Sequence, residues 1–339
     1  MPLGEFELIR QFFDRGPARR ALLGIGDDAA LLAPVPAGSV IAVSTDMLIE
    51  GRHFFAGADP LRLGHKALAV NLSDLASMGA QPRAFTLALA LPAVDEPWLA
   101  AFRQGLFALA DRFDCELVGG DTTRGPLTIS ISIFGEVPAG AALRRDAAQP
   151  GDDVWVSGAL GAAAWAVERR RQASGLGQSA VGDGDGDGDG TSGAHSAGGA
   201  DCADLRLDCP EPRVALGLAL RHLARAAIDV SDGLIADLGH ILERSRVGAE
   251  LRWPDVPQAA ELAPLPEALR QRLALSGGDD YELLFTAAPE NRIAVEALGR
   301  RLDLPLARIG AIAAGSGLAV LDARGRRLEI EHGGFDHFR

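Results

Sequence analysis

Two spacings of apolar residues alternate along the first 140 positions of the chain. Helical spacing predicts helices over residues 6–13, 60–78 and 97–113. Apolar runs typical of buried strands lie at residues 40–46 and 84–92. Two more short strands are expected, one in CELVGGDTT, where a glycine turn ends it, and one in LTISISIFGEV. Because strands and helices interleave, we expect a layered α/β or α+β architecture.

The second half of the chain begins after a turn. Residues 144–161, RRDAAQPGDDVWVSGALG, contain a Pro-Gly turn followed by a new strand, so we predict domains of residues 1–145 and 146–339. Residues 171–204 are rich in Gly, Asp and Ser and cannot fill a core, so a disordered insertion is expected there. A helix over 213–225 follows, and apolar strands are expected just before SDG and just after SGGDD.

Composition then narrows the class of protein. The 339 residues are 47% hydrophobic and 23% charged, which is typical of a globular protein with room for two domains. A net charge of −13 argues against nucleic-acid and anionic-membrane partners. The first residues predict no signal peptide, no apolar run suits a membrane span, and the three cysteines lack metal-ligand spacing. We therefore expect a cytoplasmic protein.

The candidate chemistry lies in aspartates that stand beside Gly, Ser or Thr and next to short apolar segments. They are Asp27, Asp28, Asp46, Asp74, Asp121, Asp229, Asp232, Asp279 and Asp280. Asp46, Asp121 and Asp229 are each expected at the end of a strand. An environment of carboxylate and hydroxyl oxygens suits Mg²⁺ better than zinc or copper. For any single aspartate a helix cap or a turn is the favoured interpretation. Caps and turns explain the recurrence of the whole set less well, and the pattern alone indicates no more than a magnesium-dependent enzyme acting on phosphates.

Known phosphate-binding motifs do not explain these aspartates. The chain has no P-loop, and GIGDDA lacks the third glycine of a dinucleotide-binding fingerprint. If a nucleotide binds, metal ions that bridge carboxylates to phosphates must hold much of it. Lys66 is the only lysine and lies in a predicted helix, where it either binds phosphate or extends along apolar surface to pair with an acid.

Longer segments resemble a known family. In order, GIGDDAA, STDMLIEGRHF, KALAVNLSDLASMGA, VGGDTTRGP, IDVSDGLIADLGHI, SGGDDYELLF and GFDHF closely resemble the thiamine-monophosphate kinases. That family is part of the aminoimidazole ribonucleotide synthetase superfamily. The resemblance runs from residue 4 to 338 and is broken mainly by the predicted insertion.

The resemblance implies a two-domain fold and an activity. It implies an N-terminal α/β domain that dimerises through its sheet, so that the protein is a homodimer, and a C-terminal α/β domain that closes over the site. It also implies Mg²⁺-dependent transfer of a phosphoryl group from ATP to thiamine monophosphate. The acceptor is a phosphate oxygen, already anionic near neutral pH because the second pKa of a phosphate monoester is about 6. No strong general base is therefore expected.

Site residues are carried over by motif. The implied metal ligands are Asp28, Ser44, Thr45, Asp46, Asp74, Asp121, Asp229 and Asp232, of which Asp46, Asp74 and Asp121 are the implied catalytic residues. The implied ATP contacts are Gly120, Asp121, Arg145 and Ser231. The implied contacts to thiamine monophosphate are His53, Asp279 and Phe335. Asp27 is expected either to lie in a turn or to contact a metal ligand without binding the metal itself. Without the motif, His53 would be taken for a core histidine and Phe335 for a packing residue.

The chain departs from the family pattern at three positions. Asp279 stands where the family usually has the longer Glu, and Phe335 stands where Trp or Tyr is common. Arg103 lies near a position that stacks on adenine in the family, and no such role is assigned to it. Two alternatives to the kinase remain open. One is another ATP-using enzyme of the superfamily, and the other is a non-catalytic sensor that binds nucleotide and metal.

Overall fold

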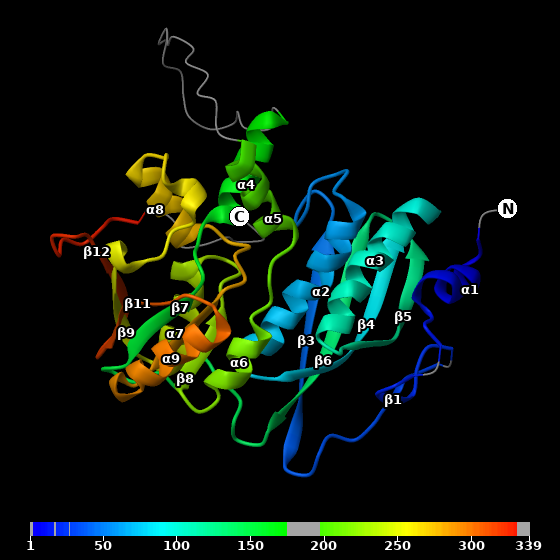
Figure 1. Cartoon of the computed structure of the whole chain (residues 1–339), viewed down its shortest axis with the longest axis horizontal. Coiled ribbons are helices and arrows are strands. Elements are labelled where there is room, and N and C mark those ends of the chain that lie inside the picture. Colours follow the sequence, from blue (N-terminus) through cyan, green and yellow to red (C-terminus); the bar gives the residue numbers. More distant parts are fainter. Residues whose placement is uncertain (1–2, 17, 27, 175–196, 331–339) are drawn as a thin grey trace, which may run out of the picture.

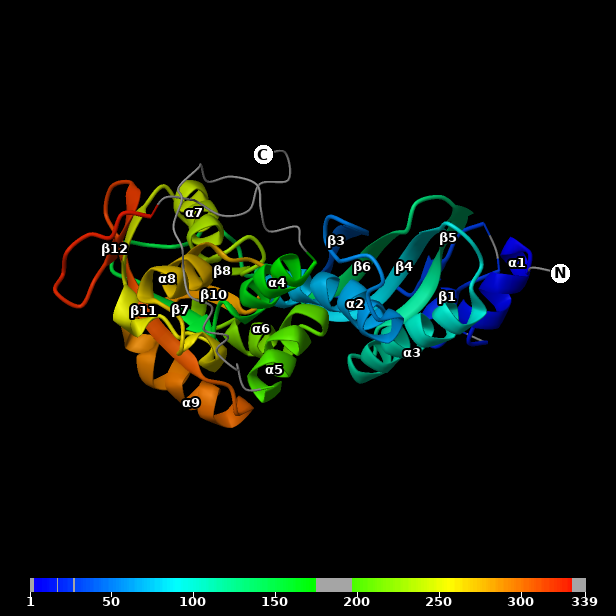
Figure 2. The same cartoon turned by 90° about the horizontal axis from the view of Figure 1, so that it is seen from above.

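Two β-sheets, one in each half of the chain, organise the fold (Figure 1). The structure is a computed structural model that describes residues 3–16, 18–26, 28–174 and 197–330. Seen from above, each sheet carries its own helices, and α2 (Pro60–Ser77) runs from the N-terminal sheet towards the C-terminal half (Figure 2). This arrangement confirms the mixed α/β class expected from the interleaved pattern.

The N-terminal sheet has four strands and one helix-covered face. Its spatial order is β3 (Ser39–Ile49), β6 (Thr128–Pro138), β4 (Gln81–Leu91) and β5 (Glu116–Arg124). Only β4 and β5 pair in parallel. Helices α2 and α3 (Glu96–Arg112) pack on one face, because alternate residues of the strands, such as Ile131 and Leu87, are buried there. On the other face, a small hairpin of β1 (Ala21–Leu23) and β2 (Leu31–Leu32) packs against Ala84 and Val118.

The C-terminal sheet has six strands, in the order β12-β9-β11-β7-β10-β8. The strands are β7 (Asp153–Ser157), β8 (Ala224–Asp229), β9 (Gly248–Arg252), β10 (Leu283–Ala287), β11 (Leu306–Ala313) and β12 (Gly317–Leu321). The helices of this half are α4 (Ala162–Ala173), α5 (Ala197–Asp208), α6 (Val214–Leu220), α7 (Leu234–Ser245), α8 (Glu267–Ser276) and α9 (Arg292–Leu302). A short α1 (Glu5–Leu8) and a π-helical turn (Ile9–Phe13) precede the N-terminal sheet. The predicted domain boundary at residue 145 falls in the connection between β6 and β7.

Helix α2 links the two halves because it packs on both. It contacts β3 and β6 of its own sheet, and α6 and β8 of the other half. Its buried residues, such as Leu68 and Leu72, belong to one core cluster that also contains Leu216 and Phe285. The halves therefore share an apolar core along α2, and side chains from both can converge on it.

Sequence reasoning misplaced two aspartates relative to their strands. Asp46 lies inside β3, and Asp121 lies inside β5, because the Gly-Gly pair before it continues the strand. Gly120 has φ +149°, and a Cβ there would lie 1.8 Å from the carbonyl oxygen of Leu87. The glycines therefore allow close pairing with β4 instead of ending the strand.

The prediction of a disordered insertion over residues 171–204 is wrong at both of its ends. Residues 171–173 end α4, and residues 197–204 belong to α5, so both ends of the 171–204 segment are helical. Arg170 of α4 donates two hydrogen bonds to Asp208 of α5, at 2.8 and 2.6 Å. Such pairing between helices cannot be read from a composition rich in Gly and Asp. Residues 175–196 lie outside the described part of the chain.

Among the described helices, none is long and apolar enough to cross a membrane.

Gly64 of α2 and Gly105 of α3 allow the two helices to cross closely. This close contact predicts an effect of substitution on stability. A Cβ on Gly105 would lie 1.8 Å from the carbonyl oxygen of Leu61, so the helices would have to separate. We expect Gly105→Ala to lower the free energy of unfolding by about 1–3 kcal/mol, as overpacked cores do. Urea unfolding followed by circular dichroism measures this change.

Gly239 of α7 is the matched control, since a Cβ there would meet nothing within 4 Å. Gly239→Ala should raise the free energy of unfolding by about 0.5–1 kcal/mol, because alanine favours helix over glycine. Equal effects of the two substitutions would contradict the role of Gly105 in the crossing.

Candidate active site

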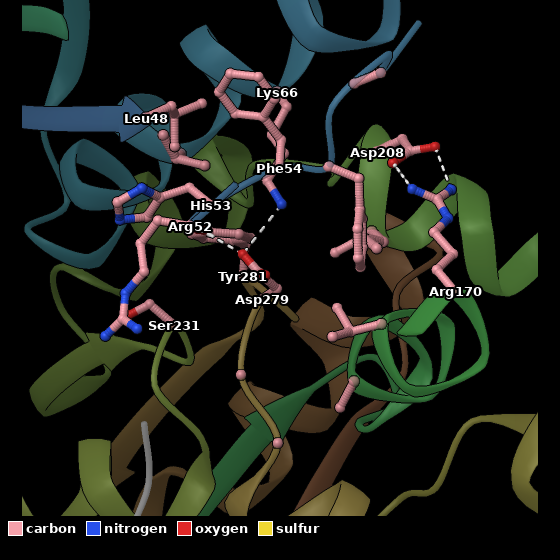
Figure 3. A pocket seen from close by; sticks show the side chains of 18 of the residues that line it. Leu48, Arg52, His53, Phe54, Lys66, Arg170, Asp208, Ser231, Asp279 and Tyr281 are labelled. Carbon is pink, nitrogen blue, oxygen red and sulfur yellow. Dashed lines mark hydrogen bonds and ion pairs between the residues drawn. The ribbon is translucent and has the colours of Figure 1, made fainter. Parts of the chain in front are cut away.

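A cavity of about 1660 Å³ lies where the two halves meet (Figure 3). Its wall includes the end of β3 and the loop after it, α2, the turn after β8, the segment before β10, and parts of α4 and α5. Lys66, Val70 and Asp74 line it from α2. Their spacing of four residues places them on one face of the helix, and Lys66 and Asp74 are about 12 Å apart along its axis.

Four of the aspartates that were predicted as metal ligands line this cavity. Asp46 comes from β3, Asp74 from α2, Asp229 from the end of β8, and Asp232 from the turn that follows. Hydroxyl groups hold two of them in place. The Ser44 hydroxyl donates a hydrogen bond to Asp74, and the Ser73 hydroxyl donates one to Asp229 at 2.7 Å. The structure therefore brings these four of the predicted metal ligands to one cavity.

Burial and mutual repulsion disfavour the charged form of these carboxylates. Burial, followed by the charge of Asp74, raises the pKa of both Asp46 and Asp229 to about 7. Burial also raises the pKa of Asp74, while the Ser44 hydroxyl and the charge of Arg145 lower it. The cluster thus holds more negative charge than its protein neighbours neutralise.

A fifth aspartate shapes the turn that carries Ser231 and Asp232. The backbone N–H groups of Ser231, Asp232 and Gly233 donate to one oxygen of Asp237, at 3.0, 3.1 and 3.1 Å. Asp237 lies in the first turn of α7, where it also complements the helix dipole. Sequence analysis did not single it out, although an acid in the first turn of an apolar helix is a recognisable signal.

Three acidic residues lie just before β10, namely Asp279, Asp280 and Glu282, and each has a different partner. Asp280 accepts a hydrogen bond from the Gly161 N–H at 2.8 Å, at the start of α4. Glu282 is buried and pairs with Arg213 and with Arg206. Asp280 therefore secures a helix start, and its inclusion among the metal candidates is not supported by its position.

Asp279 lines the cavity and meets Lys66. The Lys66 Nζ lies 3.2 Å from the Asp279 Oδ1, and the Tyr281 hydroxyl donates to the same oxygen at 3.1 Å (Figure 3). Lys66 therefore pairs with an acid, as one of the two predictions for it expected. His53 also lines the cavity, and its Nδ1 accepts a hydrogen bond from the Ile49 N–H at 3.0 Å. In neutral His53 the proton is therefore on Nε2.

Part of the predicted set lies elsewhere. Asp121 pairs with Ala88, Ala88 with Ser130, and Ser130 with Met47, so Asp121 is three strand spacings, or roughly 14 Å, from β3. Residues paired across a sheet share a face, and Met47 is exposed. Asp121 and Met47 therefore point to the open face.

Asp46 points the opposite way. It pairs with Ile131, which is buried beneath the helices. Thr45 follows the open face and contacts Ser132, hydroxyl to hydroxyl, at 2.7 Å. Asp28 lies in the turn between β1 and β2. Asp28, Gly120 and Asp121 are all absent from the cavity lining. Alternation along a strand could have shown from sequence that Thr45 and Asp46 face opposite sides.

The remaining candidates have clear places or fall outside the structure. Arg145 acts electrostatically on Asp74 and Asp229, so it belongs to the same neighbourhood. Arg103 lies over the Phe107 ring at 5.7 Å, outside the cavity lining. Asp27 and Phe335 lie outside the described residues.

The oxygen atoms of the cavity suit a hard cation such as Mg²⁺, which completes its coordination shell with water and substrate phosphates. Among the described residues, no group of three or more His, Cys, Asp or Glu side chains is placed to enclose a single metal ion. Mg²⁺ usually takes one or two carboxylates and completes its shell with water and substrate phosphates. The all-oxygen cluster of under-neutralised carboxylates suits that mode, with Ser44, Asp46, Asp74, Asp229 and Asp232 as the available ligands.

The position of Asp280 predicts a pH-dependent stability effect. Burial raises its pKa to about 8, well above the value of about 3.9 in an unfolded chain. Because the folded pKa is the higher one, Asp280 costs stability progressively as pH rises from about 4 to about 8. Asp280→Asn keeps an acceptor for Gly161 and removes the charge. Its gain in unfolding free energy should be about 2.5–3 kcal/mol larger at pH 9 than at pH 6, measured by urea unfolding.

Asp153→Asn serves as the control, because Asp153 is also buried but pairs with Arg292 and Arg308. That substitution should lower stability at both pH values, since it leaves two arginines without their carboxylate. A gain for Asp280→Asn that is equal at the two pH values would show that its charge is not what matters.

Comparison with known proteins places the chain in a family. The AIR synthase related protein N-terminal domain matches residues 26–137, and the AIR synthase related protein C-terminal domain matches residues 149–323. The thiamine-monophosphate kinase of Salmonella typhimurium is 44% identical, over 100% of this chain and 99% of that protein.

Solved structures agree. The thiamine-monophosphate kinase from Stenotrophomonas maltophilia has a TM-score of 0.79 and 48% identity, covering 92% of this chain and 94% of that one. The structure of AaThiL complexed with AMPPCP and TMP has a TM-score of 0.74 and 27% identity, covering 91% of this chain and 90% of that one. From the two matched domains and the full-length identity, this chain belongs to the thiamine-monophosphate kinase family of AIR synthase related proteins.

Proposed function

We propose that this chain transfers the γ-phosphoryl group of ATP to thiamine monophosphate, forming thiamine diphosphate and ADP. Full-length identity to kinases named for that substrate supports the proposal, as does the AaThiL complex with AMPPCP, an ATP analogue, and TMP. Within this structure, the observation that carries it is the cavity itself. One wall offers a cluster of carboxylates, and the Lys66–Asp279 pair lies about 12 Å along α2 from that cluster.

The reaction needs little proton chemistry. The acceptor phosphate is mostly dianionic at neutral pH, so its oxygen can attack without a strong base. The main obstacle is the repulsion between two polyanions that must be aligned in line. Magnesium ions, when bound, would neutralise that repulsion and polarise the transferred phosphoryl group. We assign their binding to Asp46, Asp74, Asp229 and Asp232.

The chain's own groups then orient the two substrates. Ser231 lines the cavity and Arg145 acts on the same carboxylates, so both are assigned to the nucleotide. Asp279 and His53 line the cavity and are assigned to thiamine monophosphate, whose thiazolium cation suits a carboxylate. Phe335 is kept in that role as a stacking residue.

The protein is proposed to act as a homodimer through the open face of the N-terminal sheet. Edge strand β3 exposes apolar side chains on that face, namely Ile41, Val43, Met47 and Ile49. Soluble chains rarely leave a contiguous apolar strand edge uncovered. Thr45 and Asp121 point to the same face. Their part in a metal site, that of Asp28, and the ATP contact assigned to Gly120 therefore depend on what a second copy brings there.

The activity is tested by thiamine diphosphate formation. Purified protein with ATP, thiamine monophosphate and MgCl₂ should form the product, and excess EDTA should stop it. Asp46→Asn should reduce kcat at least about 100-fold, because it weakens cation binding beside the transferred group. Chromatography of the products and circular dichroism of the variant give turnover and fold together.

Asp255→Asn is the matched control, since Asp255 pairs with the exposed Arg252 at 3.6 Å and does not line the cavity. It should keep wild-type turnover. ATP binding without any product from the wild-type protein would favour the sensor, and full activity of Asp46→Asn would remove Asp46 from the metal site.

The dimer is tested by charge placed on the open face. Val43 is 60% exposed near the middle of β3. We expect the wild-type protein to sediment as a dimer and Val43→Asp to sediment as a monomer, because a dimer would bury that charge without a partner. Analytical ultracentrifugation distinguishes the two.

Ile293→Asp provides the comparison, because Ile293 is 79% exposed on α9, in the other half of the chain. That variant should remain a dimer. A wild-type protein that sediments as a monomer at all concentrations would rule the interface out.

A further inference from the structure

The only lysine of the chain is buried in the cavity wall. Lys66 is 3% exposed, whereas the other 32 of the 33 basic residues are arginines. A buried ammonium needs a close anionic partner, because taking it out of water is costly. Lysine also provides a compact charge on a flexible stem, which reaches where a planar guanidinium does not fit. The contacts of Lys66 should therefore explain why a lysine is buried at this position.

Lys66 contacts the carboxylate of Asp279 and little else that is charged. Its Nζ lies 3.2 Å from the Asp279 Oδ1. Asp208 is also near, but it is engaged by Arg170 at 2.6 Å and by Arg62 at 3.3 Å. Among the described residues, Asp279 is thus the one carboxylate within ion-pair distance of Lys66.

The backbone at Asp279 is held in an unusual conformation. Asp279 has φ +66° and Tyr281 has φ +51°, a left-handed region that is strained for a bulky residue. Two hydrogen bonds tie this segment to the turn after β8. The Asp279 N–H donates to the Ser231 carbonyl, and the Tyr281 N–H donates to the Val230 carbonyl, each at 2.8 Å. Asp279 is therefore fixed beside Ser231, which is assigned to ATP.

The side chain of Asp279 is held on one oxygen only. Lys66 and the Tyr281 hydroxyl both contact Oδ1, and the three side chains converge in the cavity (Figure 3). Among the described residues, the hydrogen bond and the ion pair of this carboxylate both go to Oδ1, and none goes to Oδ2. The arrangement thus immobilises the carboxylate and leaves one oxygen for a ligand.

We propose that Lys66 is a positioning residue that acts on thiamine monophosphate through Asp279, by holding Oδ1 so that Oδ2 meets the thiazolium cation. This inference rests on the proposed function, because it names the substrate group that Asp279 receives.

The first test needs no substrate, because Tyr281 is the only tyrosine. Protein labelled with ring-¹³C tyrosine gives one set of ring signals, which report the hydroxyl bonded to Asp279. Lys66→Met should shift that set, as the carboxylate leaves its place. Arg225→Met, which breaks the single-cation pair with buried Asp152 outside the cavity, should leave it unchanged. An unshifted Tyr281 signal in Lys66→Met would overturn the inference.

The second test asks whether Lys66 acts through Asp279. We expect Lys66→Met to raise KM for thiamine monophosphate about tenfold, with kcat and KM for ATP changed less than about twofold. Asp279→Asn should raise the same KM at least as much. If Lys66 works through Asp279, the double variant should be no worse than Asp279→Asn alone. Effects that multiply would show instead that Lys66 binds the substrate directly, and the inference would be wrong.

Failure of the proposed function looks different. A wild-type protein that forms no thiamine diphosphate would refute the kinase, whatever its variants do. Calorimetric binding of thiamine monophosphate without ATP then decides the Lys66 question alone. Weaker binding by Lys66→Met than by wild type or Arg225→Met supports positioning, whereas equal binding, or none by the wild type, overturns it.

Discussion

The structure depends on concentrated negative charge at the junction of its two halves. Asp46 and Asp74 come from the N-terminal half and Asp229 from the other, and α2 packs against both. Such a cluster costs stability, as the raised pKa values of Asp46 and Asp229 indicate. The hydroxyls of Ser44 and Ser73 orient these acids without neutralising them. The cluster is thus preorganised for cations, and folding energy from the shared apolar core offsets its cost.

Neighbouring residues in one segment divide the remaining tasks. Asp280 secures the start of α4, and Glu282 is buried against arginines. Asp279 alone of these three acids lines the cavity. The left-handed backbone on both sides of Asp280 allows this division, because it turns successive side chains in different directions. The strained backbone therefore has an identifiable result: the Asp279 carboxylate is directed to the cavity, and the two acids that follow it serve structural roles.

The sequence alone was enough to predict several helices and strands and part of the candidate active site. The long periodic segments gave α2 and α3 almost to the residue, since α2 covers Pro60–Ser77 where 60–78 was expected. Aspartates beside hydroxyls predicted that Asp46, Asp74 and Asp229 would gather. Gly119-Gly120 misled, because a glycine pair marks a turn and a close strand pairing equally well. The helices on either side of residues 175–196 were missed because partner contacts, such as Arg170 with Asp208, stabilise them.

The two faces of one sheet explain why the predicted metal set divides. Ser44 and Asp46 point to α2, whereas Thr45 points to the open face, as does Asp121 on the far strand. No rotation of side chains within one copy can bring Asp121 past three strand spacings to Asp46. If both groups serve one reaction, the open face must be completed by another surface. The exposed apolar edge of β3 beside Thr45 is the part of the described chain most suited to receive one. The proposed dimer and the divided acid set thus follow from the same alternation along β3.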